Sequence, residues 1–521
     1  MDNRPEFVLD IQNRQYRLIK LLGKGGQGEV WNTNDPEIVV KICTDQSGNY
    51  QMGEKGRKAY GLKLDKVRTL DLPESIHVAM PLAPLQPPYR GFSMRLMTDM
   101  QELMAIMVHV TPDTYRDSGG LRRRLVLLRE LARVLEQLHS RGIVYCDLSP
   151  RNVFISSDSE NNEVWLIDPD NMTFENELAA PVRTPRYSAP EINRFRQPNT
   201  TWSDAYSFAL LAFELLTTCK PFEGRILLEG LPTDQNGALL AQDDDDDDDA
   251  WGDEWQDETS EKIGPDGVDM SGKDNYDKAD AGLFPWVDDP DNDCNRTTKG
   301  LPRPVLLTTR LRELFQRTFS EEGRTVPASR PSMRQWYDAL DEVVGVTVRC
   351  PACGQTYRWA KVVEEKRTCP WCGADRPPCF KVKLMNGYRM ERFPFEPHYD
   401  KGAKIKTLTK QVRVIPQKLP VFYITNRQIL EPLFEEPEEN ILEIRYEPQS
   451  AQYTVRSLAA GLHAWYLDRD SSNDGTRKEE TGRLRPLPCQ RSSLSGLTLY
   501  IRNSPEGTDE RFRCVQFSRL S

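Results

Sequence analysis

Two carboxylates and an amide are spaced in this sequence as a phosphoryl-transfer site would need them. Asp147 and Asn152 lie five residues apart in the segment 144–155, which directly follows an apolar helical stripe. Asp168 comes next, at the end of the apolar run that begins with Val164. One carboxylate of such a set could orient an attacking hydroxyl and take its proton, while the amide and the second carboxylate hold Mg²⁺ of a bound ATP. A capping aspartate or a turn asparagine would explain either residue alone, but not the ordered set.

A second group of residues, near the N-terminus, could cradle phosphates. The segment 18–31 carries Gly23, Gly25 and Gly28 in the spacing G-x-G-x-x-G, followed by Val30. Strand-like sequence lies on both sides, which favours a glycine flap over phosphates rather than a dinucleotide-binding turn, because a helix should follow such a turn. Glycines let backbone N–H groups approach phosphate oxygens that a Cβ would block. Three glycines alone would fit a plain hairpin equally well.

The position of Lys41 favours a phosphate-binding flap over a plain hairpin. It ends the strand-like run that begins with Ile38, thirteen residues after Gly28. A lysine at a strand end is commonly a solvated charge, but at this distance from a glycine flap we expect its ammonium to hold the α- and β-phosphates. The secondary structure that must position these residues begins with short strand-like runs. Helices follow along the chain, and apolar periodicity predicts them at 121–140, 202–218, 305–319 and 333–344.

In its ordered motifs, the stretch 14–345 resembles a eukaryotic-type (Hanks-type) protein kinase. Thr184-Pro-Arg-Tyr-Ser-Ala-Pro-Glu191 is similar to the end of that family's activation segment, and Ser203–Phe208 is similar to the buried helix that anchors the catalytic loop. Arg330-Pro-Ser resembles the late arginine whose partner is the glutamate of the Ala-Pro-Glu motif, here Glu191.

The resemblance implies an α+β, bilobal protein-kinase fold, with an N-lobe at about 14–97 and a C-lobe at about 98–345. It also implies a protein serine/threonine kinase, which transfers the γ-phosphoryl of Mg-ATP to hydroxyls of protein substrates. Asp147 would be the catalytic aspartate and Lys41 the phosphate-binding lysine.

Further residue roles follow from the same resemblance. The magnesium ligands would be Asn152 and Asp168, and Asp204 would hold the catalytic-loop backbone through hydrogen bonds. Glu54 is the candidate partner of Lys41, in a helix after the lysine strand. The residues expected to contact the nucleotide are Gly23, Lys24, Gly25, Gly26, Gly28, Val30, Lys41 and Glu54.

One departure from the family pattern bears on regulation. Tyr145-Cys146 replaces the His-Arg that precedes the catalytic aspartate, so no arginine lies beside Asp147 to bind an activation-loop phosphate. We therefore expect activity that does not need phosphorylation of Thr173 or Thr184. Loss of activity in an alanine variant, restored by glutamate, would contradict this expectation.

Other departures bear on the reaction itself. Ser149 replaces a lysine near the γ-phosphate, which leaves the preference for Ser/Thr or Tyr open. Pro169-Asp170 replaces Phe-Gly after Asp168, and a proline fixes φ near about −65°. A catalytically weak, nucleotide-binding pseudokinase scaffold is therefore an alternative to an active kinase. The presence of all four catalytic and magnesium-binding residues favours the kinase.

Four cysteines after the kinase-like stretch have the spacing of a metal site. They form two C-x₂-C pairs separated by fifteen residues, Cys350 with Cys353 and Cys369 with Cys372. Two such knuckles can offer four thiolates tetrahedrally to one Zn²⁺, and a closed shell predicts a structural rather than a catalytic zinc. We expect a zinc ribbon at 346–380, with Cys379 a spare thiol. A zinc-ribbon adaptor without enzymatic role is the second alternative function.

Strand-like runs between turns predict a small all-β module at 381–521. Within it, 463–476 faintly resembles the strand and Ser-x-Asn-Gly-Thr loop of forkhead-associated, phosphothreonine-binding domains, although Asp474 is inserted. A plain β-sandwich docking module is the default expectation.

The order of kinase, acidic insertion, ribbon and β module resembles the kinases of the bacterial TerY-type phosphorylation triad. That resemblance implies a PP2C-type phosphatase and a von Willebrand factor A protein as partners in bacterial signalling.

Charge and composition limit the other functional classes. The net charge of −10 is concentrated in 234–299, where 22 acidic and 5 basic residues give −17 and leave +7 for the rest. Seven consecutive aspartates at 243–249 predict a disordered acidic insertion at about 233–282, after which the apolar 283–287 should pack on the fold. We find no dense basic stripe for nucleic acid. No run approaches the ~18–20 apolar residues of a membrane helix, so we expect a cytoplasmic protein with reduced thiols.

Overall fold

The computed structural model describes residues 4–25, 28–44, 50, 61, 64–70, 72–175, 177, 180–240, 263–264, 267–270, 273–359, 368–389, 405–430, 432–469, 482–502 and 511–520. The chain divides into two compact units, one of Met1–Gly119 and Arg123–Leu340, the other of Gly120–Arg122 and Asp341–Ser521. Gly26, Glu54 and the aspartate run 243–249 lie outside the described residues. The predictions made for them therefore stay predictions.

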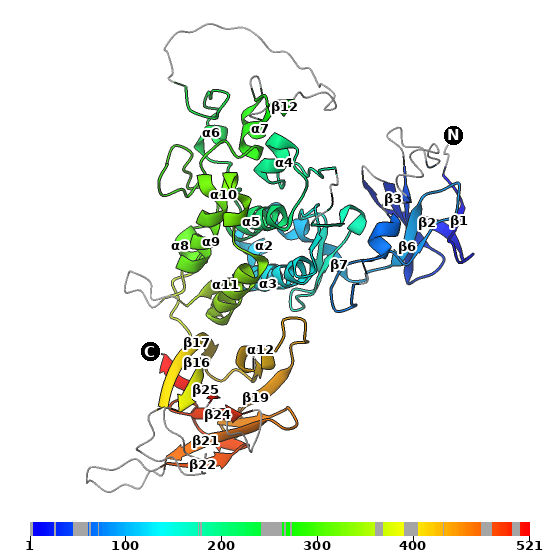
Figure 1. The fold of residues 1–521 in the computed structure, drawn as a ribbon. Helices are drawn as coiled ribbons and strands as arrows, with labels where there is room; N and C mark the ends of the chain where they lie inside the picture. Colours follow the sequence, from blue (N-terminus) through cyan, green and yellow to red (C-terminus); the bar gives the residue numbers. More distant parts are fainter. Residues whose placement is uncertain are drawn as a thin grey trace. The chain divides into compact units, whose positions relative to one another are not determined.

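The N-terminal part of the first unit is an antiparallel sheet in the order β1-β2-β3-β4-β6-β5 (Figure 1). Its strands are β1 (Phe7–Leu9), β2 (Gln15–Gly25), β3 (Gly28–Thr33), β4 (Ile38–Cys43), β5 (Ala83–Pro84) and β6 (Gly91–Arg95). Val40 and Ile42 of β4 join a buried cluster with Trp31. Because strand side chains alternate between faces, Lys41 points to the opposite face of the sheet.

Short strands carry the chemistry-bearing loops of the first unit. They are β7 (Met100–Glu102), β8 (Ile143–Val144), β9 (Val153–Ser156), β10 (Val164–Leu166) and β11 (Thr173–Phe174), with β12 (Ile263–Gly264) and β13 (Gly267–Val268) further along. β9 lies between β7 and β10, and β8 pairs with β11. The loop with Asp147 therefore leaves β8 and returns as β9, and Asp168 follows β10.

The remainder of the first unit is mainly helical. The helices are η1 (Leu103–Ile106), α2 (Pro112–Asp117), α3 (Gly120–His139), η2 (Pro169–Asn171), α4 (Pro190–Phe195), α5 (Thr201–Thr217), α6 (Arg225–Leu228), α7 (Asn275–Asp280), α8 (Arg303–Leu306), α9 (Thr309–Phe319), α10 (Glu321–Thr325), η4 (Pro327–Ser329) and α11 (Met333–Gly345). The first three residues of α3 and the last five of α11 belong to the second unit. α5 is buried along most of its length and begins at a capping box made by Thr200 and Ser203. Among the described residues, no helix is both long and apolar enough to cross a membrane.

The apolar segment after the acidic insertion packs on the helices, as predicted. Phe284, Trp286 and Val287 are buried, and the indole N–H of Trp286 donates to Gln316 at 2.7 Å. The helix predicted at 305–319 is wrong in one respect, because it is split into α8 and α9. Leu307 is extended, and the side chain of Thr308 accepts a hydrogen bond from the N–H of Leu311, so it caps a new helix.

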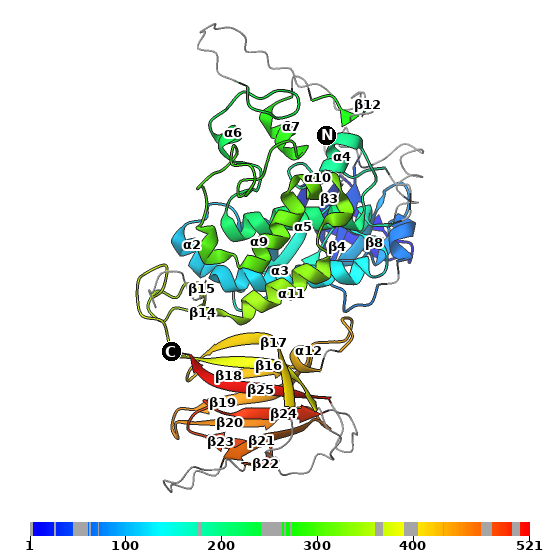
Figure 2. The ribbon, with the colours of Figure 1, turned by 60° about the vertical axis from the view of Figure 1, so that its left-hand side comes forward.

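The second unit contains a β-hairpin followed by two sheets (Figure 2). The hairpin is β14 (Thr347–Arg349) and β15 (Thr356–Arg358). The sheet of six has the order β17-β16-β25-β24-β21-β22 and the sheet of four has the order β18-β19-β20-β23. The bounds are β16 (Cys379–Arg389), β17 (Ile405–Pro416), β18 (Val421–Thr425), α12 (Asn426–Ile429), β19 (Asn440–Glu447), β20 (Gln452–Ser457), β21 (His463–Arg469), β22 (Gly482–Pro486), β23 (Cys489–Arg491), β24 (Thr498–Arg502) and β25 (Arg511–Leu520).

The two sheets of this unit share one apolar core. Val382, Ile444, Val455, Leu499 and Phe517, from five different strands, belong to one buried cluster. The chain is thus a mixed α+β protein with C-terminal β-sheets. The loop that resembles a phosphothreonine-binding loop lies mostly outside the described residues, so the resemblance to forkhead-associated domains stays a prediction.

Candidate functional site

The loop between β8 and β9 is hydrogen-bonded to a carboxylate of α5. Asp204, almost fully buried, accepts hydrogen bonds from the backbone N–H groups of Tyr145 at 2.7 Å and Cys146 at 2.9 Å. Its Oδ2 also accepts from the Nε2 of His139 at 3.1 Å. The predicted role of Asp204 as a backbone anchor is confirmed by these contacts. Cys146 has φ of 74°, a left-handed conformation that the two anchored N–H groups help to maintain.

Asp147, the next residue of this loop, is contacted by three side chains. The amide of Asn152 donates to the backbone oxygen of Asp147 at 2.8 Å, which fixes the loop between them. The hydroxyl of Thr184 donates to Oδ1 of Asp147, and the amide of Asn171 donates to Oδ2 at 3.1 Å. Asn152 uses its nitrogen in this bond, and the oxygen of the same amide is the atom that can ligate Mg²⁺.

Lys41 contacts two carboxylates from the segment after β10. Its Nζ lies 2.9 Å from Oδ1 of Asp168 and 2.8 Å from Oδ2 of Asp170. Burial by itself would lower the pKa of Lys41, but the charges and hydrogen bonds of Asp170 and Asp168 outweigh it and raise the pKa above its ordinary value. The ammonium is therefore protonated at neutral pH. The structure brings together Lys41 and Asp168, which the sequence placed in one nucleotide site.

A tight turn after β10 orients both carboxylates. Asp168 is left-handed, with φ of 54°, and Pro169 then starts the 3₁₀ turn η2, which ends at Asn171. Within this turn Asp170 contacts Lys41 and Asn171 contacts Asp147. One turn of three residues thus joins the lysine to the aspartate of the catalytic loop.

Tyr145 shows how closely the acidic side chains converge. Its phenol is fully buried and donates to the backbone oxygen of Ile167, the residue before Asp168. Burial raises the pKa of Tyr145 well above its ordinary value, and the carboxylates of Asp147, Asp168, Asp204 and Asp170 raise it further. The loop of Asp147 and the strand end of Asp168 are therefore connected directly.

The glycine segment forms the end of the β2–β3 hairpin. Gly25 pairs with Gly28, and Val30 pairs with Lys41 across β3 and β4. Gly28 has φ of +152°, and a Cβ there would collide with the backbone oxygen of Ile42, so this position needs glycine.

Lys24 of the flap is engaged within the hairpin. Its Nζ lies 3.1 Å from Glu29, whose carboxylate also accepts from the phenol of Tyr50 at 2.6 Å. Of the remaining predicted nucleotide contacts, Gly23 has open space at its Cβ position, whereas Gly26 and Glu54 lie outside the described residues.

Two ion pairs fix the segment between β10 and α5. Arg330 donates to both carboxylate oxygens of Glu191, at 2.8 Å each, which confirms the predicted pair. Lys66 contacts Glu177, and its Nζ lies 2.7 Å from the hydroxyl of Thr173. Thr173 in turn donates to Glu177 at 2.9 Å.

Sequence reasoning missed three residues of this site. Asp170 and Tyr145 were noted as departures from the family pattern but were given no contact, and Asn171 was not considered. Two polar residues follow Asp168-Pro169 directly in the sequence, but only the structure shows that both are buried. A buried polar side chain needs a partner, and here the partners are Lys41 and Asp147.

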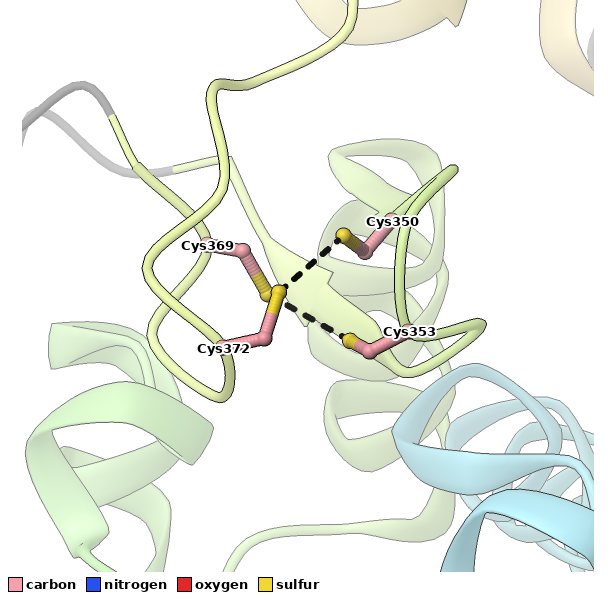
Figure 3. Close-up of side chains that lie close together, drawn as sticks. All are labelled: Cys350, Cys353, Cys369 and Cys372. Carbon is pink, nitrogen blue, oxygen red and sulfur yellow. Dashed lines mark hydrogen bonds between the residues drawn. The ribbon is translucent and has the colours of Figure 1, made fainter.

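The four cysteines of the second unit form a compact cluster (Figure 3). Their sulfurs all lie within 4.8 Å of one another, with Cys350 to Cys372 at 3.7 Å and Cys353 to Cys369 at 3.8 Å. Zn–S bonds of about 2.3 Å in a tetrahedron require sulfurs about 3.8 Å apart, so the cluster fits Zn²⁺.

The backbone of each knuckle is closed by a glycine. Gly354 and Gly373 both have φ of 74°, and their N–H groups donate to the oxygens of Cys350 at 3.0 Å and Cys369 at 2.9 Å. Burial raises the pKa of the Cys350 thiol, but the N–H groups of Cys353 and Ala352 donate to its sulfur and bring the pKa down to about 7. Burial has the larger effect at Cys369, where it raises the pKa of the thiol to about 12.

Comparison with known proteins agrees with the geometry of the first unit. Residues 99–256, a stretch that includes Asp147, Asn152 and Asp168, match the family described as protein kinase domain. Ribosomal protein S6 kinase alpha-3 of Homo sapiens is 29% identical over 227 residues, which cover 40% of this chain and 28% of that protein. Serine/threonine-protein kinase pkn2 of Myxococcus xanthus is 27% identical over 251 residues, which cover 45% of this chain and 28% of that protein.

The match therefore spans less than a third of the length of these curated relatives. The chain carries a protein kinase domain that is distantly related to Ser/Thr protein kinases.

Proposed function

We propose that this protein is a serine/threonine kinase that transfers the γ-phosphoryl group of Mg-ATP to hydroxyls of protein substrates. The observation that carries the proposal is the single contact network in which Lys41 meets Asp168 while Asn171 of the same turn meets Asp147. A purely structural role, such as capping a helix or closing a turn, would explain Asp147 or Asp168 singly. It would not explain why the turn 168–171 contacts both the buried Lys41 and the carboxylate of Asp147.

Each residue has a definite task in this reaction. Asp168 and the oxygen of Asn152 would hold Mg²⁺, which when bound neutralises charge on the phosphates. Lys41 would orient the α- and β-phosphates, and the backbone of the Gly23–Gly28 flap would cover them. Asp147 would accept a hydrogen bond from the substrate hydroxyl and take its proton as the new P–O bond forms and the bond to ADP breaks.

The test is phosphoryl transfer from radiolabelled ATP by wild type, Asp147→Asn and Lys41→Met. We expect incorporation by wild type and a loss of about a hundredfold or more in each variant, as for removal of a positioned electrostatic group. A matched control is Asp113→Asn, because Asp113 is exposed on α2 and pairs only with residues of that helix in the described contacts. Equal incorporation in all proteins would favour a nucleotide-binding pseudokinase scaffold and overturn the proposal.

We further propose that the four-cysteine cluster holds one structural Zn²⁺. The sulfur separations and the two glycine-closed knuckles support four-thiolate coordination, which leaves no open position for catalysis. An adaptor role for this unit would be additional to the kinase activity.

The proposed partners and location rest on sequence alone. A kinase domain implies protein substrates, whereas the PP2C-type phosphatase and the von Willebrand factor A protein come from the resemblance to the TerY-type triad. Co-purification with the full-length chain, with and without an intact Cys350, tests this part of the proposal. A cytoplasmic location is proposed on the same sequence grounds.

A further inference from the structure

The buried charge of Lys41 needs a permanent counter-charge. Its side chain is only 5% exposed, and an uncompensated ammonium at that depth would be costly. In the described part of the chain two carboxylates meet it, Asp168 and Asp170. These two differ in what else they can do.

Asp168 is the exposed member of the pair. Its side chain is 38% exposed, and it is the carboxylate that we assign to Mg²⁺. A carboxylate that ligates a divalent ion gives up much of its negative charge to that ion, so it cannot by itself hold the ammonium. When the metal is bound, the contact of Lys41 with Asp168 is therefore weakened, and Asp170 remains to hold the lysine in place for the phosphates.

Asp170 has the opposite character. Its side chain is 2% exposed, and its Oδ2 lies 2.8 Å from Nζ of Lys41. Pro169 fixes the backbone before it, and Asn171 after it is tied to the carboxylate of Asp147. Asp170 is therefore held in place from both sides, in a turn that a bound metal has no need to move.

We propose that Asp170 is the residue that positions Lys41 for the phosphates, in the role that the sequence assigned to Glu54. This inference rests on the proposed kinase function. It places the lysine and its counter-charge in the same part of the structure as Asp168 and Asp147.

The experiment is a double-mutant cycle with two independent readouts. Asp170→Asn, Lys41→Met and the double variant are prepared in the full-length chain, and their thermal unfolding is measured without nucleotide. Lys41→Met leaves the buried Asp170 without its cation, and Asp170→Asn leaves the buried Lys41 with the half-exposed Asp168 alone, so we expect both to lower the unfolding midpoint. The double variant should unfold at or above the higher of the two single midpoints, because it removes both charges.

The second readout is the dissociation constant of Mg-ATP together with the turnover number. We expect Asp170→Asn to weaken binding about tenfold and to lower turnover about a hundredfold. Adding Asp170→Asn to Lys41→Met should change neither quantity further, since Asp170 acts through the lysine. The conservative Asp170→Glu should recover part of the binding.

The outcomes separate this inference from the proposed function. Wild type without phosphoryl transfer would overturn the function, whereas the unfolding cycle needs no activity. Additive effects of Asp170→Asn and Lys41→Met on the unfolding midpoint would overturn the inference. A second cycle pairs Lys41→Met with Glu54→Gln, and a larger coupling there than with Asp170→Asn would also overturn it. Asp113→Asn, at an exposed aspartate, is the matched control and should be additive with Lys41→Met.

Folding failure is also informative. If Asp170→Asn alone does not fold, recovery of a folded protein in the double variant supports the pair. If Lys41→Met folds but neither protein with Asp170→Asn does, then Asp170 has a structural role that is independent of the lysine, and the inference is wrong.

Discussion

Arg330 and Glu191, which are 139 residues apart in the sequence, form a buried two-pronged ion pair with both N–O distances at 2.8 Å. The guanidinium also lies 4.7 Å from the ring centre of Tyr206 in α5. The pair therefore links α4, which contains Glu191, to the buried helix α5.

We predict that Glu191→Gln destabilises the first unit by about 3–5 kcal/mol, because it leaves a fully buried guanidinium without its counter-charge. Urea unfolding followed by tryptophan fluorescence measures this change. The matched control is Asp338→Asn, which removes an exposed ion pair with Arg334 and should cost about 0–1 kcal/mol. Equal effects of the two variants would contradict the structural role assigned to the pair.

Thr184 is predicted to act through its hydroxyl rather than through a phosphate. Because that hydroxyl donates to the carboxylate of Asp147, Thr184→Ser should retain most of the phosphoryl-transfer rate. Thr184→Ala should lower it about tenfold or more, and Thr184→Glu should not restore it, since a second carboxylate would repel Asp147. Initial rates of autophosphorylation measure the series. Restoration by glutamate would indicate a regulatory phosphate instead.

The activation segment is predicted to be held without phosphorylation. Thr173 is buried, and Lys66 already has Glu177 as an acidic partner at this position. We expect protein treated with a phosphatase to keep its full rate, and we expect Glu177→Gln to lower the rate because Lys66 loses that partner.

Thr173→Glu provides the opposing variant for this prediction. It would place a second carboxylate beside Glu177 and should reduce activity. A rate that falls after phosphatase treatment and returns with Thr173→Glu would show that the segment needs a phosphate.

Metal removal is predicted to affect the second unit. We expect one Zn²⁺ per chain by elemental analysis, and we expect a chelator to lower the unfolding temperature of that unit, because bound metal stabilises the folded state. Cys369→Ser should abolish zinc binding. Cys379→Ser is the matched control, since Cys379 packs in the same apolar cluster, and burial raises the pKa of its thiol to about 12. Zinc retained by Cys369→Ser, or lost from Cys379→Ser, would contradict the assignment.

Features set by short-range patterns could be predicted from the sequence. The spacing of Gly23, Gly25 and Gly28 requires only a hairpin with room for phosphates, and the two C-x₂-C pairs require only two knuckles. The Arg330–Glu191 pair was predictable over a long range because both residues stand in motifs that the resemblance names.

The partner of Lys41 could not be predicted in this way. Asp170 is 129 residues from the lysine, and no spacing rule relates the two. Their contact depends on the path of the turn η2, which Pro169 and the left-handed Asp168 direct toward the sheet. The break between α8 and α9 was missed for a different reason. The apolar periodicity continues through Leu307 and Leu311, so the cap at Thr308 is hidden in a pattern that suits one helix.

The anchoring of the catalytic loop by Asp204 has a consequence for hydrogen exchange. The amide protons of Tyr145 and Cys146 are both bound to a carboxylate in the first turn of the most deeply enclosed helix of the first unit. Because both bonds are buried, we expect these protons to exchange slowly, and exchange at the rate of the α5 amides would show that loop and helix open in one step. The amide protons of Tyr145 and Cys146 thus report whether helix α5 and the loop between β8 and β9 open together.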